Sequence, residues 1–107
     1  MAVTTGPPGP PEKPELVEAL KSSISVKWQP PATDGGSPIT GYVVERRLAE
    51  SQRWLKIGKT GADDLAYKDA EVVEDNVYEY RIMAENKAGV GEPSSTIGPV
   101  TAKDPWS

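Results

Sequence analysis

Two adjacent carboxylate pairs, Asp63-Asp64 and Glu74-Asp75, are the side chains whose type and spacing could support acid–base chemistry. Paired carboxylates act as general acid and general base when a cleft separates their pKa values. The chain contains no histidine and no cysteine, which excludes Ser-His and Cys-His catalysis and the usual zinc and copper sites. We therefore interpret both pairs as solvated loop charge. We expect no enzymatic activity, no catalytic residue, no metal and no cofactor.

Two glycine-containing segments look like fragments of ligand-binding motifs. Asp34-Gly35-Gly36 lacks the further oxygen ligands of a calcium loop and the lysine of a phosphate-binding loop. Gly89-Val90-Gly91 matches part of a dinucleotide fingerprint, but Pro93 would end a helix that began after it. We predict that the first segment is a turn that needs glycine and that residues 86–93 form a hairpin loop.

The overall composition describes one acidic domain with many turns. The 107 residues carry a formal net charge of −4, and ten glycines and eleven prolines predict few helices. Phosphate binding needs clustered cations, so we expect neither nucleic acid nor an anionic membrane as a partner. No apolar run approaches the roughly 20 residues of a membrane span, and the first residues lack the apolar stretch of a secretory signal. The absence of cysteines and of Asn-x-Ser/Thr acceptors favours a cytoplasmic protein.

Apolar and polar residues alternate with period two along most of the chain, which predicts half-buried strands. The segment at 77–85 is the clearest example, because Tyr78, Tyr80 and Ile82 share one face while Glu79 and Arg81 share the other. The predicted strands are 15–20, 22–29, 39–48, 53–59, 65–69, 77–85 and 94–102. Pro99 implies that the last strand lies at an edge or contains a bulge. Seven short strands separated by turns predict an all-β fold, an antiparallel sandwich of two sheets.

The identity of the inward residues adds a family resemblance. Pro14 lies near the first strand, Trp28 in the second and Tyr42 in the third, and the run Tyr78-x-Tyr80-x-Ile82 precedes Asn86-x-x-Gly89. In this order and spacing the chain resembles a fibronectin type III domain, a seven-stranded immunoglobulin-like β-sandwich. The resemblance implies a domain at 7–103, linker or non-native residues at 1–6 and an exit linker at 104–107. It also implies a structural core of Trp28, Tyr42, Val44, Val72, Tyr78, Tyr80 and Ile82, with Trp28 as the anchor and Tyr78 as a tyrosine corner.

A narrower resemblance covers three further segments. These are PPATDGGSPITGYVVE at 30–45, AENKAGVGEPS at 84–94 and AKDPW at 102–106, together with GPPGPP at 6–11. They resemble type III domains of giant sarcomeric proteins, most of all those of the titin A-band; twitchin, myosin-binding protein C, myomesin and obscurin share parts of the pattern.

This narrower resemblance implies a structural link in a tandem array of type III or immunoglobulin-like domains, which organises or binds the myosin thick filament and bears mechanical load. It implies a location in the sarcomere of the myofibril and a monomeric isolated domain. The alternative is an ectodomain module of a cell-surface receptor or adhesion protein. The sequence contains no Arg-Gly-Asp and no paired Trp-Ser motif to support that alternative.

Charged residues on the outward faces of two strands are the candidate partner surface. Glu45 and Arg47 would be neighbours of Glu79 and Arg81 if the strands pair as they do in the family. They form either solvated ion pairs or a docking surface for a filament protein. The cations Arg46, Arg47, Arg53, Lys56 and Lys59 could meet an acidic helical rod, or could serve solubility alone. The candidate surface therefore comprises Glu45, Arg47, Arg53, Lys56, Glu79 and Arg81, with myosin or another thick-filament protein as the partner.

The N-terminal segment at 6–14 contains five prolines in nine residues. Proline excludes a helix or a central strand here, so we expect a semi-rigid, extended linker. Short, stiff linkers set the angle between neighbouring modules, whereas a plain spacer would only separate them.

Overall fold

The computed structural model describes residues 4–106 as strands, turns and loops, with no helix in that range. Residues 1–3 and 107, which belong to the predicted flanking linkers, lie outside the described residues. The strands in chain order are β1 (Glu12–Ala19), β2 (Ile24–Gln29), β3 (Gly41–Leu48), β4 (Leu55–Gly61), β5 (Ala66–Asp69), β6 (Val77–Asn86), β7 (Gly89–Pro93) and β8 (Ile97–Thr101). No helix suited in length and hydropathy to crossing a membrane occurs among the described residues.

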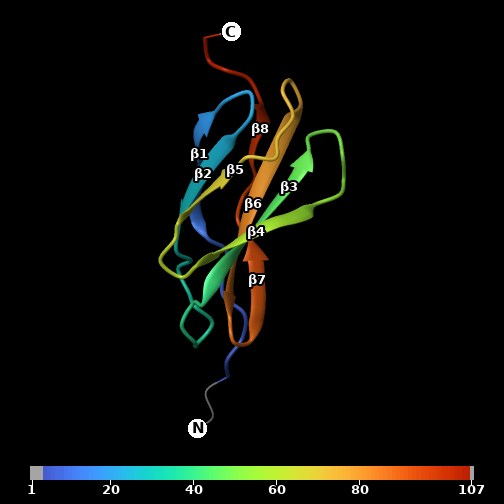
Figure 1. The fold of residues 1–107 in the computed structure, drawn as a ribbon. Helices are drawn as coiled ribbons and strands as arrows, with labels where there is room; N and C mark the ends of the chain where they lie inside the picture. Colours follow the sequence, from blue (N-terminus) through green and yellow to red (C-terminus); the bar gives the residue numbers. More distant parts are fainter. Residues whose placement is uncertain (1–3, 107) are drawn as a thin grey trace.

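The strands form two antiparallel sheets that face each other, as predicted (Figure 1). The smaller sheet has the order β1-β2-β5, and the larger has the order β4-β3-β6-β7 with β8 also paired to β6. β3 and β6 pair without a break from Gly41 opposite Glu85 to Leu48 opposite Tyr78. This long pairing is the rigid frame that carries the candidate partner surface.

The predicted last strand at 94–102 contains β8 alone, and β7 precedes it as an additional strand. The stretch from Gly89 to Thr101 is thus divided into two strands, both of which pair with β6. The division lies at Ser94, whose N–H donates to the carbonyl of Ile82 at 2.8 Å while its hydroxyl accepts the Ile82 N–H at 3.0 Å. The prediction of a loop over all of 86–93 is therefore wrong for Gly89–Pro93. Pairing with β6 continues to a two-residue turn at 87–88, because Gly89 adopts a φ of +133° that most residues avoid.

Pro99 lies in β8, which is at the edge of its sheet and pairs with β6 through an irregular register between Tyr78 and Tyr80. The prediction of an edge strand or a bulge is confirmed, since a proline has no N–H to donate to a second neighbouring strand. Other predicted boundaries differ by two or three residues. β1 begins at Glu12, and β4 begins only after Trp54.

The core lies between the two sheets and is built from alternate residues of the central strands. Trp28 of β2 packs edge to face against Tyr42 of β3, with ring centroids 5.5 Å apart and planes at 60°. Each residue named for the core from the sequence is buried in this cluster: Trp28, Tyr42, Val44, Val72, Tyr78, Tyr80 and Ile82. The alternation of buried and exposed positions along β2 is what period-two patterning requires.

Tyr78 closes the loop between β5 and β6. Its hydroxyl accepts the N–H of Val73 at 2.9 Å and the side-chain amide of Asn76 at 3.3 Å. The ring is 4% exposed. This is the geometry of a tyrosine corner, in which a buried ring and a backbone hydrogen bond hold the chain where it crosses between sheets.

The turn at Asp34-Gly35-Gly36 depends on glycine. Gly35 and Gly36 have φ values of +77° and +95°, and the Asp34 carboxylate accepts the N–H of Gly36 at 2.9 Å. A left-handed pair of residues closed by an aspartate is a backbone turn.

Candidate partner surface

The outer face of the larger sheet carries two directly opposed ion pairs between β3 and β6. Glu45 lies opposite Arg81, with Oε1 2.7 Å from Nε, and Arg47 lies opposite Glu79, with Nε 2.8 Å from Oε1. The side chains are between 15% and 29% exposed. Cross-strand pairs of this kind each contribute about 0.2–1 kcal/mol. We call these four residues the charge ladder.

Trp54 contacts one arginine from each of the two ion pairs of the charge ladder. The guanidinium carbons of Arg47 and Arg81 each lie 4.5 Å from the centroid of its ring. Each cation is thus held by a carboxylate and by an aromatic face, a contact worth roughly 0.5–1 kcal/mol at exposed sites. Sequence reasoning assigned Trp54 to a strand and gave it no role at the surface. The signal that could have found it is an aromatic residue just ahead of a strand that borders two outward-facing arginines.

The other members of the outward cation group fall into different environments. Lys59 pairs with Glu85 at 2.8 Å. Within residues 4–106, Arg53 and Lys56 make no ion pair and are exposed. The structure therefore leaves Arg53 and Lys56 as the cations of this surface that are free to meet an external anion.

Arg46 does not belong to the outer surface, so its inclusion in an outward cation group is wrong. Period-two alternation puts it on the same face of β3 as Tyr42 and Val44. Its guanidinium reaches β5, where Nη1 lies 3.1 and 2.9 Å from the two carboxylate oxygens of Asp69. The Asp69 side chain is 2% exposed and that of Arg46 is 17% exposed.

Asp69 is the centre of a buried polar cluster that sequence reasoning missed. Its Oδ2 accepts the hydroxyl of Tyr80 at 2.6 Å, and its Oδ1 accepts the N–H of Glu71 at 3.1 Å. Burial, reinforced by the hydrogen bond to Asp69, raises the pKa of Tyr80 well above its ordinary value, so the phenol remains a donor. The group Arg46, Asp69 and Tyr80 joins three strands from both sheets. We call it the inter-sheet clamp.

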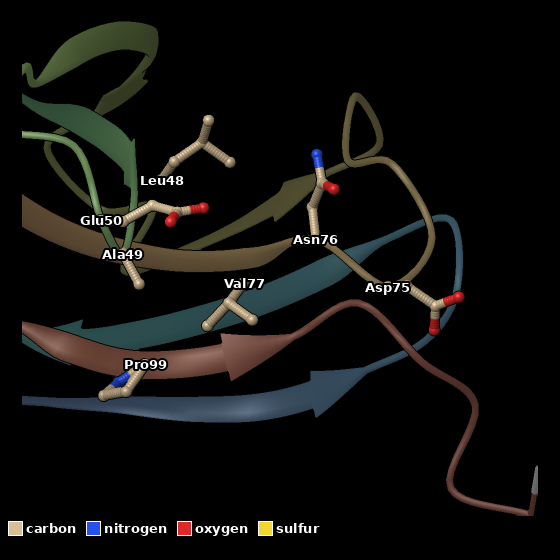
Figure 2. A pocket seen from close by; sticks show the side chains of 7 residues that line it. All are labelled: Leu48, Ala49, Glu50, Asp75, Asn76, Val77 and Pro99. Atoms are coloured by element: carbon tan, nitrogen blue, oxygen red, sulfur yellow. The ribbon is translucent and has the colours of Figure 1, made fainter.

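The surface contains shallow hollows, and one of them borders Asp75 of the predicted carboxylate pair Glu74-Asp75. This hollow, of about 490 Å³, lies at the pole where the chain leaves the sandwich (Figure 2). Its lining is Leu48, Ala49, Glu50, Asp75, Asn76, Val77 and Pro99. Figure 2 shows Glu50 and Asp75 on separate loops at opposite ends of the labelled group, with Asn76 and Val77 between them. No group of three metal-ligating side chains occurs within the described part of the chain.

The geometry is matched by known proteins. A model of the fibronectin type III domain matches residues 9–100. The chain belongs to the fibronectin type III family. In titin and myosin-binding protein C this domain is a non-catalytic module.

Curated relatives of this type III domain include proteins of muscle. It is 38% identical over 92 residues to cardiac-type myosin-binding protein C of Gallus gallus, a match that covers 86% of the chain and 7% of that protein. It is 36% identical over 100 residues to fast-type myosin-binding protein C of Homo sapiens, covering 94% of the chain and 9% of that protein. The chain thus spans less than a tenth of the length of these relatives.

Solved structures with the same fold include modules of sarcomeric proteins. A crystal structure of titin domains matches with a TM-score of 0.86 at 33% identity, over 92% of this chain and 33% of that one. The kinase region of twitchin from C. elegans matches with a TM-score of 0.87 at 32% identity, over 94% and 18% of the two chains. A titin module from human cardiac muscle matches with a TM-score of 0.80 at 32% identity, over 92% and 95%.

Proposed function

We propose that this type III domain is a non-enzymatic structural module of a giant muscle scaffold protein. It acts as one link in a tandem array whose neighbours are type III or immunoglobulin-like domains. It helps to organise or bind the myosin thick filament, and it carries mechanical load along the array. Its location is the sarcomere, in the cytoplasm.

The observation that carries this proposal is the anchoring of the two chain ends at opposite poles of an elongated sandwich (Figure 1). With its terminal segments the chain measures 60 Å along its long axis, against 26 and 18 Å across. At one pole the N–H of Gly6 donates to the carbonyl of Gly35 at 2.9 Å. At the other, Ala102 donates to the carbonyl of Asn76 at 2.9 Å and accepts from Asp75 at 2.8 Å. Tension on both ends therefore acts along the long axis of the domain.

A link that bears load is expected to fail in one cooperative step. Pulling a concatemer of the 107-residue chain in a single-molecule force experiment should release about 270–300 Å per domain. That length follows from roughly 3.3–3.6 Å per extended residue over residues 6–104, less the folded length of 60 Å. Release in two smaller steps would show that the sheets separate independently, and would contradict a single load-bearing unit.

The partner proposed for this domain is an acidic helical surface of the thick filament. Support comes from the muscle relatives, one of which is named for binding myosin, and from the free cations Arg53 and Lys56 beside the charge ladder. Because the charges of the charge ladder are already paired with each other, a partner's carboxylates would interact most favourably with the two unpaired cations, Arg53 and Lys56. A local positive site on an acidic domain also accelerates association with an acidic rod at low salt.

Co-sedimentation with purified myosin filaments tests this partner. We expect the 107-residue chain to pellet with filaments at low salt and to be released as salt screens the charges. The combined substitution of Arg53→Glu with Lys56→Glu should reduce pelleting.

The matched control is Lys68→Glu with Lys87→Glu, which changes the same number of charges on the smaller sheet and on the β6–β7 turn. This variant should pellet like the native chain. Absence of pelleting at low salt, or equal loss in the two double variants, would contradict a docking surface at Arg53 and Lys56.

A further inference from the structure

The Pro-rich segment at residues 6–11, which we call the lead segment, is seated on the domain. The N–H of Gly6 donates to the carbonyl of Gly35 at 2.9 Å, and the N–H of Gly9 donates to that of Thr33 at 3.0 Å. Pro8 and Pro11 are buried. A free linker would show none of these contacts. Residues 7–11, which the family resemblance places inside the domain and the proline content alone places in a semi-rigid linker, are part of the folded module.

Two glycines allow the lead segment to pack this closely against the domain. A Cβ atom at Gly35 would overlap the carbonyl of Gly6, and a Cβ at Gly91 would overlap the carbonyl of Pro8. Gly35 also needs glycine for its φ of +77°, but Gly91 lies in β7 without such a φ. Close approach of the lead segment is therefore the reason for glycine at position 91.

Asn86 connects Gly6, the first residue of the lead segment, to Asp34 and to the turn that contains Ala88. It is the last residue of β6 and is 4% exposed. Its side-chain amide donates to the carbonyl of Gly6 at 2.9 Å and to that of Asp34 at 2.7 Å, while its Oδ1 accepts the N–H of Ala88 at 2.8 Å. Both amide hydrogens are thus used, and one carboxamide joins three segments of the chain.

We propose that Asn86 is a positioning residue that sets the direction in which the chain enters this module, and with it the angle to a preceding module. That such an angle matters rests on the proposed function in a tandem array. Prolines alone would keep the lead segment extended but would leave it free to swing as a rod about its attachment to β1. The contacts at Gly6 and Gly9 hold the rod at two points, so the rod cannot swing about β1 without breaking them.

The test uses the 107-residue chain and two readouts. The first is hydrogen exchange at the amides of Gly6 and Gly9. The second is a nitroxide on Thr4→Cys, a unique label because the chain has no cysteine, whose relaxation effect maps the direction of the lead segment. If the contacts of the lead segment weaken, the amides of Gly6 and Gly9 exchange faster. If the lead segment takes up several directions, the nitroxide broadens signals from more residues at the pole of the sandwich that contains Gly6.

Asn86→Ala is expected to accelerate exchange at Gly6 and Gly9 about tenfold, the effect of losing one hydrogen bond of ordinary strength. In the native chain we expect the nitroxide effect around Gly36, which lies beside Thr4, and in Asn86→Ala it should spread over more of the pole. Asn76→Ala is the matched control, because Asn76 is also an asparagine with a donating amide but lies at the opposite pole. It should leave both readouts unchanged.

Gly91→Ala keeps the inference testable if Asn86→Ala unfolds the chain. Its Cβ would displace Pro8 without touching the Asn86 amide, so the nitroxide effect should spread in a folded protein. Unchanged exchange and an unchanged nitroxide pattern in Asn86→Ala would overturn the proposal, as would equal changes in Asn76→Ala. These experiments use no muscle protein, so a negative result would not contradict the proposed load-bearing and partner functions. Equally, a negative result in the force or co-sedimentation experiments would not contradict the proposed role of Asn86.

Discussion

Asp69→Ala is expected to lower the free energy of unfolding by about 3–5 kcal/mol, the usual effect of removing one partner of a buried ion pair. The substitution leaves the guanidinium of Arg46, 17% exposed, without its carboxylate. It also removes the acceptor of the Tyr80 hydroxyl, which is 2.6 Å from Asp69, and of the Glu71 N–H. Urea denaturation followed by tryptophan fluorescence measures the loss.

Asp63→Ala is the matched control, because Asp63 is exposed in the turn between β4 and β5. It should change the free energy of unfolding by less than about 0.5 kcal/mol. Domains of this size have only about 5–15 kcal/mol of stability, so Asp69→Asn is the milder companion variant. It keeps the shape and an acceptor for Tyr80 but loses the charge that pairs with Arg46. Equal stability of Asp69→Ala and Asp63→Ala would show that the inter-sheet clamp does not hold the sheets together.

Trp28→Ala is expected to destabilise the domain by about 3–5 kcal/mol through the cavity it leaves. The ring is 1% exposed and makes an edge-to-face contact with Tyr42, so the substitution opens the centre of the sandwich. Circular dichroism during thermal unfolding measures the effect, which we expect as a lower midpoint or a loss of the folded state.

Trp28→Phe separates lost volume from lost polar contacts. The indole Nε1 has no hydrogen-bond partner among residues 4–106, so phenylalanine loses packing area but no hydrogen bond, and the loss should be smaller than with alanine. Trp106→Ala is the control for removing a tryptophan, because that ring is 78% exposed. A Trp28→Ala variant as stable as Trp106→Ala would contradict the role of Trp28 as the core anchor.

Most of the fold was predictable because each side chain of a strand points to the face opposite its neighbour. In 77–85 this rule alone assigns Tyr78, Tyr80 and Ile82 to the core. The same rule applied to position 46 assigns Arg46 to the inner face, and at position 69 it assigns Asp69 to the face of Tyr67. Because both side chains are charged, Arg46 was interpreted as an outward-facing cation, and the inter-sheet clamp was not predicted.

The parts that were not predictable depend on loops and on sheet edges. Trp54 stacks on Arg47 and Arg81 because the chain before β4 folds over the outer face, which no local pattern indicates. The hairpin continues through Gly89–Pro93 because β6 offers free backbone groups as far as Asn86. Backbone pairing of this kind depends on the neighbouring strand and hardly on the side chains of Gly89–Pro93.

By itself the sequence determined which side chains face inward, and therefore that two layers enclose one core, because the period of side-chain direction along a strand is a local property. Only the tertiary structure decided which distant residues meet. Asp69 and Arg46 are 23 positions apart, and Asn86 and Gly6 are 80 apart. Their contacts arise from strand register and from the closing of the sandwich, and both depend on the whole chain at once.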